Sequence, residues 1–146
     1  MNKLIFSAFF CLVVLIWSAG EIFACTCVKP KPVEAVYEQH SAIFSGKVTS
    51  VKTVENIRRV KIRVEKLWKG NLPKTITFST MAVGSMCGYN FAFGKRYLIY
   101  ASGENMNELS TSICTRTGLL SKSKEDVETL NKLGAKDDSK TKSSPK

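Results

Sequence analysis

The sequence lacks the residue sets that hydrolytic and phosphate-binding enzymes commonly use. Its 146 residues include a single histidine, His40, and a lone histidine at the end of a predicted helix is typical of a capping or surface residue. No Ser-His-Asp set, glycine-rich phosphate loop or His-Glu-x-x-His motif is present. Glu104 and Glu108 lie in a polar turn, where we expect their carboxylates to be solvated. The sequence therefore does not predict an enzyme.

Hydrophobic runs of membrane-spanning length are also missing. Residues 4–17 form the longest apolar run, which is shorter than the roughly 20 residues that a spanning helix needs. Lys3 precedes this run, and a short segment that ends at the small residue Ala24 follows it, as in a cleaved secretion signal. We expect residues 1–24 to be a signal peptide, with a cut after Gly20 as the alternative, and the mature protein to be extracellular without a transmembrane segment.

Acidic residues are outnumbered by basic ones. The chain has 22 Lys and Arg against 12 Asp and Glu, which gives a formal net charge of +10. Because the basic residues are spread along the sequence, general solubility is the simpler explanation. The alternative is attraction to an anionic polysaccharide or another cell-surface polymer. No recognised nucleic-acid-binding motif is present, and we expect no nucleic-acid partner.

The cysteines are few and are consistent with export. Cys11 lies in the predicted signal, which leaves Cys25, Cys27, Cys87 and Cys114, an even number. A bond between Cys25 and Cys27 would close a strained ring, so each should pair with a distant partner. A zinc site built from the same four thiolates is the alternative, and the absence of a Cys-x-x-Cys pair argues against it.

Alternating apolar and polar residues predict a mostly β fold. Five short strands are expected, over residues 42–51, 58–68, 74–80, 96–101 and 109–114. Gly46, inside the first of them, indicates a bulge or a sharp bend. The pattern favours a small five-stranded Greek-key barrel of the OB type, stapled by disulfides and flanked by short helices.

Two helices are expected at the ends of this barrel. Pro32 opens a short helix over residues 33–40. Ser123 caps a second helix, with Asp126 at the capping-box position, and Gly134 ends it.

The chain ends in a polar stretch. Residues 135–146 hold no apolar side chain beyond Ala135, and we expect them to form a basic, disordered tail. The folded domain is therefore expected to cover residues 25–134.

Cleavage after Ala24 would make Cys25 the first residue of the mature protein. Its free α-amine would titrate near pH ~8, so a useful neutral fraction exists at physiological pH. This amine and the carbonyl oxygen of the same residue can form a five-membered chelate on a metal ion. A catalytic zinc keeps one coordination position open for water. A rigid N-terminus could displace that water in a metalloprotease cleft, and the next side chain would enter the specificity pocket.

Several short motifs occur in an order and spacing that resembles the N-terminal inhibitory domain of the tissue inhibitors of metalloproteinases. They are Cys-Thr-Cys-Val at residues 25–28, Val-Glu-Lys-Leu-Trp-Lys-Gly at 64–70, Ser-Met-Cys-Gly at 85–88, and Cys114 after Arg-Tyr-Leu-Ile-Tyr at 96–100. The resemblance extends over residues 25–134. The family's third disulfide in this domain and its cysteine-rich C-terminal domain have no counterpart here.

The resemblance implies an OB-type barrel of the netrin-like class, with disulfides Cys25–Cys87 and Cys27–Cys114. It implies that Cys25 binds the zinc of a target metalloprotease, of the matrixin, adamalysin or another zincin class. Thr26 would point into the primary pocket of that enzyme. The residues that would contact the protease are Cys25, Thr26, Cys27, Val28, Ser85 and Met86. No cofactor is implied.

Two other functions remain open on the sequence. One is a secreted netrin-like module that binds anionic polymers and inhibits nothing. The other follows from Ile-Phe-Ala-Cys at residues 22–25, which resembles a bacterial lipobox. Lipidation would occupy the sulfur of Cys25 and usually acylate its amine. It would exclude both the disulfide to Cys87 and metal chelation, and would anchor the protein at the cell surface.

Overall fold

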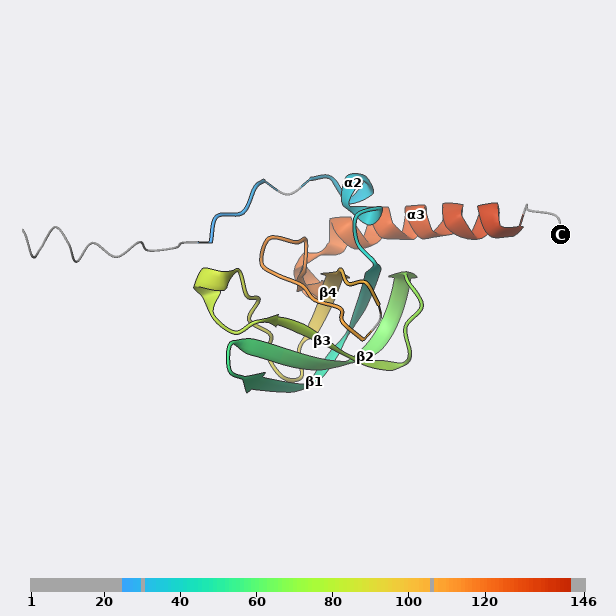
Figure 1. Cartoon of the computed structure of the whole chain (residues 1–146). Coiled ribbons are helices and arrows are strands. Elements are labelled where there is room, and N and C mark those ends of the chain that lie inside the picture. The colour runs from blue at the N-terminus through green and yellow to red at the C-terminus, as the bar shows by residue number, and fades with distance from the viewer. Residues whose placement is uncertain (1–24, 30, 106, 143–146) are drawn as a thin grey trace, which may run out of the picture.

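The computed structural model describes residues 25–29, 31–105 and 107–142 (Figure 1). The predicted signal peptide, residues 1–24, lies outside the described residues. Helix α2 comes first, five strands follow, and helix α3 ends the described part of the chain. The protein is a mostly β domain stapled by two disulfides, as the sequence predicts.

Five strands form one antiparallel sheet in the order β3-β2-β1-β4-β5. The strands are β1 (Ala42–Val54), β2 (Ile57–Lys69), β3 (Thr75–Met81), β4 (Arg96–Ala101) and β5 (Gly118–Leu119). The first three are joined as consecutive hairpins, and β4 returns to pair with the free side of β1. This is the Greek-key order expected from the sequence.

One face of the sheet carries the main core. The alternation along β2 sends Val60 and Ile62 inward, where both are fully buried against Phe44 and Phe78. The bulge expected at Gly46 is confirmed, because the β1–β2 register shifts between Ser45 and Gly46. A Cβ atom at Gly46 would collide with the carbonyl group of Arg63, so only glycine fits at this point.

The opposite face of the sheet is covered at one end by helices α2 (Val33–Tyr37) and α3 (Lys124–Lys142), as Figure 1 shows. A second buried cluster forms there from Val33, Val36, Tyr37, Ile43, Leu98, Tyr100 and Leu130. Beyond the helices, the β1 and β2 residues on this face are half-buried or exposed. The sheet is therefore two-sided at one end and open to solvent at the other.

The sheet does not close into the expected barrel. Within the described residues, the edge strands β3 and β5 form no ladder with each other. The gap between β3 and the end of β4 is spanned instead by single bridges, from Ser110 to Ser79 and from Ser110 to Ser102. These bridges satisfy backbone groups of the β3 edge without adding a strand.

Residues 109–114 are not the fifth strand that the sequence predicts. Apart from the bridges at Ser110 they are irregular, with a turn at Ile113 and Cys114, and the fifth strand is the short β5, which pairs with Tyr97 and Leu98. The reason lies in the hydroxyl side chains around Thr111, which bond to nearby backbone groups and so compete with a ladder.

The helices also differ from the expectation. Helix α2 ends at Tyr37, and His40 Nδ1 donates to the Val36 carbonyl oxygen at 2.9 Å, which confirms the capping role expected for this histidine. Helix α3 does not stop at Gly134 but runs on to Lys142, so residues 135–142 are helical rather than a disordered tail.

Packing explains why α3 passes through its glycine. Leu133, directly before Gly134, packs on the same buried cluster as Trp68 of β2, and Trp68 Nε1 donates to Asn131 Oδ1 at 2.8 Å, so the helix contacts the sheet there. Such tertiary contact outweighs the modest helix-breaking tendency of glycine. Among the described helices, none combines the length and the hydropathy needed to cross a membrane.

Candidate functional site

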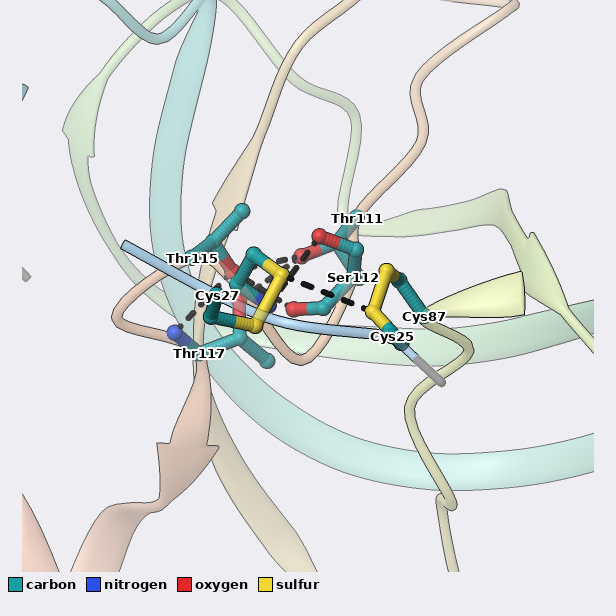
Figure 2. The surroundings of a disulfide bond; sticks show 8 residues. Cys25, Cys27, Cys87, Thr111, Ser112, Thr115 and Thr117 are labelled. Atoms are coloured by element: carbon teal, nitrogen blue, oxygen red, sulfur yellow. Dashed lines mark hydrogen bonds between the residues drawn. A yellow bond between two sulfur atoms is a disulfide. The ribbon is translucent and has the colours of Figure 1, made fainter. Parts of the chain in front are cut away.

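Two neighbouring disulfides fix the first described residues to the end of the sheet. Cys25 is bonded to Cys87 and Cys27 to Cys114, with Cα–Cα distances of 5.4 and 5.1 Å. These are the pairs that the resemblance implies. Figure 2 shows the two bonds next to each other along the N-terminal segment, which carries one cysteine of each bond. We use "N-terminal segment" for residues 25–28.

The sulfur atoms of the two disulfides form one cluster. Sγ of Cys25 lies 3.8 Å from Sγ of Cys114, and the sulfurs of Cys25, Cys27 and Cys114 all lie within 4.8 Å of one another. Free thiolates at these distances could ligate zinc, but the sulfurs are bonded in pairs, and metal binding by cysteine requires the thiolate. The geometry therefore supports disulfides over the zinc site considered as the alternative.

A tight loop presents Cys87 to the N-terminal segment. The 3-10 helix η1 (Gly84–Met86) ends at Cys87, whose φ of 60° lies in the left-handed region, and the Cys87 amide donates to the Gly84 carbonyl. Gly88 follows, and a Cβ atom there would collide with the Met81 carbonyl group. The turn thus requires a glycine directly after the cysteine.

A network of threonine hydroxyls supports the loop that carries Cys114. The Thr111 hydroxyl donates to the Tyr100 carbonyl oxygen at 2.8 Å and lies 2.8 Å from the hydroxyl of Thr117. Thr115 lies 3.1 Å from Thr111, and the Cys114 amide donates to Ser112 Oγ at 3.2 Å (Figure 2). The network joins the disulfide loop to the backbone of β4, in place of the predicted strand.

An ion pair holds the chain just after the N-terminal segment, at Lys31. Arg116 donates to both carboxylate oxygens of Asp126, at 2.8 and 2.5 Å, and its third nitrogen donates to the Lys31 carbonyl oxygen at 3.1 Å. Tyr100 donates its hydroxyl proton to the same carboxylate at 3.0 Å. Burial and the negative charge of Asp126 raise the pKa of Tyr100 well above its ordinary value. Cys25 and Cys27 are therefore anchored by disulfides, and Lys31 is anchored by Arg116, whose guanidinium group is bound in turn by Asp126 of helix α3.

The structure brings the predicted protease-contact residues together. Cys25 is half-buried, Thr26 and Cys27 are exposed, and Val28 is 87% exposed. Met86 is 47% exposed on η1, beside the residue that bonds Cys25. Ser85 lies in the same helical turn.

Other exposed apolar residues around the disulfides were not predicted. Val83 and Ile113 are 42% and 43% exposed, and the Ile113 amide donates to the Cys87 carbonyl. The β1–β2 hairpin continues this apolar rim with Val54 and Ile57, because the Ala82 amide donates to Asn56 and Arg58 donates to the Ala82 carbonyl. No local sequence pattern indicates this rim, because its residues are far apart in the sequence and belong to different loops.

The carboxylates considered as a catalytic pair do not lie at this site. Glu104 and Glu108 are both exposed in the loop after β4, and Asn105 donates to Glu108 at 2.9 Å. The chemistry that the site offers is therefore that of an anchored peptide segment with an apolar rim.

No protein-family model matches the chain, and no curated protein sequence matches it significantly. The functional argument consequently rests on the geometry of the anchored N-terminal segment.

Proposed function

We propose that the mature protein is a secreted inhibitor of zinc metalloproteases, similar in its mode of action to the inhibitory domain of the tissue inhibitors of metalloproteinases. The observation that carries the proposal is the double anchoring of Thr26. The cysteines on its two sides are bonded to two different loops, and Thr26 itself is exposed between them. Because the disulfides already restrict this segment, its entry into a cleft loses little further conformational entropy.

The chemistry requires that export frees the amine of Cys25. The neutral amine and the Cys25 carbonyl oxygen would then displace water from the zinc of the target enzyme. Both ligand atoms come from the backbone, so the disulfide of Cys25 remains intact. The Thr26 side chain would occupy the primary specificity pocket, with Cys27 and Val28 in the next substrate positions.

The rim around the segment supports docking on a protein. Val28, Met86, Val83 and Ile113 expose apolar surface close to the two disulfides. Burial of apolar side chains around a rigid central anchor is the usual source of affinity in protein–protein interfaces. Preorganisation by the disulfides lowers the ordering cost of binding.

The test is a paired inhibition assay against a panel of zinc metalloproteases. One preparation begins at Cys25, and the other carries a single additional alanine before Cys25. We expect the first to inhibit at least one enzyme and the second to lose most of that inhibition, because the added residue removes the free amine. Equal inhibition by both would refute zinc chelation, and no inhibition by either would refute the proposed function.

Intact mass of the exported protein decides between this proposal and the lipid-anchored alternative. Two disulfides reduce the mass by four hydrogens relative to the reduced chain that begins at Cys25. An added acyl mass on the first residue would instead show that neither the amine nor the sulfur of Cys25 is available.

A further inference from the structure

Strand register gathers basic side chains that are far apart in the sequence. Lys47 of β1 pairs directly with Arg63 of β2 on one side and with Arg96 of β4 on the other. Nearer the β1–β2 hairpin, Lys52 of β1 pairs with Arg59 of β2. Lys61 of β2 lies between these rows, opposite Ser50. We call Lys47, Lys52, Arg59, Lys61, Arg63 and Arg96 the basic face.

These side chains share the open side of the sheet. Val60 and Ile62 of β2 are buried in the main core, so Arg59, Lys61 and Arg63 must point to the opposite face. That face is covered by α2 and α3 around Ile43, Trp68, Leu98 and Tyr100, at the end of the sheet away from the β1–β2 hairpin. Five of the six residues are exposed, and Lys47 is half-buried.

The positive charge of the face is almost uncompensated. Arg96 donates to both carboxylate oxygens of Glu65 at 3.0 Å. Among the described residues, the other five cations of the basic face form no ion pair. Like charges directly opposite each other destabilise a sheet, so the pairs Lys47–Arg63 and Lys52–Arg59 bring no benefit to the fold itself. An external anion would relieve both repulsions.

The neighbouring side chains indicate which polyanion fits. On β3, Thr75, Thr77 and Ser79 lie opposite Arg63, Lys61 and Arg59, so a row of hydroxyl groups borders the cations. The cations are spaced by roughly 5 Å across the strands and by roughly 7 Å along them. Guanidinium and ammonium groups beside hydroxyls suit the sulfate and hydroxyl groups of a sugar chain.

Two other polyanions suit the face less well. No aromatic residue pairs with these cations in the β1–β2, β1–β4 or β2–β3 register, so the face offers no stacking platform for the bases of a single-stranded nucleic acid. The apolar side chains of Val54 and Ile57 lie only at the hairpin end, whereas a membrane-surface binder places apolar groups among its cations.

We propose that the basic face binds a sulfated polysaccharide chain. The site goes beyond protease inhibition, because it lies on the strands, whereas the N-terminal segment is held by loops. A protein with both surfaces would be retained on an extracellular matrix or cell coat while its N-terminus stays available to a protease.

The experiment measures binding of the mature protein to heparin as the sulfated probe, over a range of salt concentrations. Dextran sulfate and uncharged dextran serve as competitors. The test variant combines Lys47→Gln with Arg63→Gln, and the matched control combines Lys122→Gln with Lys132→Gln, two exposed lysines outside the basic face. Both variants lose two positive charges.

We expect the test variant to bind heparin about ten-fold or more weakly near physiological salt. The slope of log affinity against log salt should fall by about two, because two cations no longer displace counterions. The control should change little, and dextran sulfate alone should compete. The test variant should unfold at the same or a higher temperature than the parent, since it removes a like-charge pair.

Several results would overturn the proposal. Equal losses in the two double variants would show that net charge alone drives binding. Binding to vesicles of phosphatidylserine or to single-stranded DNA, with no binding to heparin, would assign the face to a lipid surface or to a nucleic acid. A different outcome separates the two proposals: heparin binding by a mature protein that inhibits no metalloprotease would refute the proposed function and support the basic face.

Discussion

Arg116 and Asp126 lie ten residues apart and together connect Lys31, just after the N-terminal segment, to helix α3. The guanidinium group binds both oxygens of the carboxylate and also the carbonyl oxygen of Lys31. The side chain of Asp126 is only 10% exposed, and that of Arg116 is 26% exposed. This contact therefore fixes the backbone at Lys31 relative to helix α3.

Arg116→Met should destabilise the protein by about 2–3 kcal/mol, because the carboxylate of Asp126 would remain buried without a cation. Arg116→Lys is the matched control, since it keeps the charge but loses the bidentate contact with Asp126. It should lower the free energy of unfolding by less than Arg116→Met does. Urea unfolding measures both. The double variant Arg116→Met with Asp126→Asn should lose less than the sum of the two single variants. Strict additivity would show that the two groups do not act as a pair.

Tyr100 should make the stability of the protein depend on pH in the alkaline range. Its pKa is raised in the folded state by burial and by Asp126, so the unfolded chain releases this proton first as the pH rises past about 10. The contribution of protonated Tyr100 to the free energy of unfolding is complete below pH 10. It declines above pH 10, by at most about 1.4 kcal/mol per pH unit.

Tyr100→Phe tests this directly. The variant should be less stable by about 1 kcal/mol at neutral pH, because one hydrogen bond to Asp126 is lost. Its free energy of unfolding should then fall less steeply than that of the parent above pH 10. Lysine deprotonation affects both proteins equally and cancels in the comparison. Parallel curves would contradict the assignment of the alkaline loss to Tyr100.

Most of the sheet could be predicted from the sequence because the relevant signals are local. The alternation in β2 and the apolar run of β4 fix the faces of both strands, and Gly46 marks its bulge correctly. The strand predicted over residues 109–114 was wrong. Their apolar residues suggested a strand, whereas the hydroxyl of Thr111 donates to the backbone of β4. No local pattern reveals such a competition.

The candidate site was predictable only in part. The resemblance implied the two disulfide pairs, which the cysteine spacing alone left open, but nothing near Arg116 in the sequence indicated its contacts with Asp126 and Lys31. The basic face was missed for a related reason. Its cations are scattered along the sequence and meet only through the pairing of β1 with β2 and β4.

The second disulfide should matter for both stability and inhibition. Replacement of Cys27 and Cys114 by serine opens a loop with a sequence separation of 87 residues, which should lower the free energy of unfolding by roughly 4 kcal/mol in the chain-entropy model. Inhibition should also weaken, because Thr26 is then anchored on one side only. The assay is run at a temperature where circular dichroism shows the variant to be folded. Full potency of the folded variant would mean that the Cys25–Cys87 bond alone organises the segment.

Thr26→Gly should weaken protease inhibition selectively, by about ten-fold or more for enzymes with a deep primary pocket, since one buried side chain contributes about 1–3 kcal/mol to such a contact. Thr26→Val, which keeps the shape of the side chain, should retain more potency against apolar pockets. Lys29→Gly is the control for added backbone freedom, because Lys29 is exposed and lies outside the two anchors. Inhibition constants for each variant against several metalloproteases give the measurement. If Thr26→Gly and Lys29→Gly have the same effect on every enzyme, then chain flexibility accounts for the loss and Thr26 does not enter the pocket.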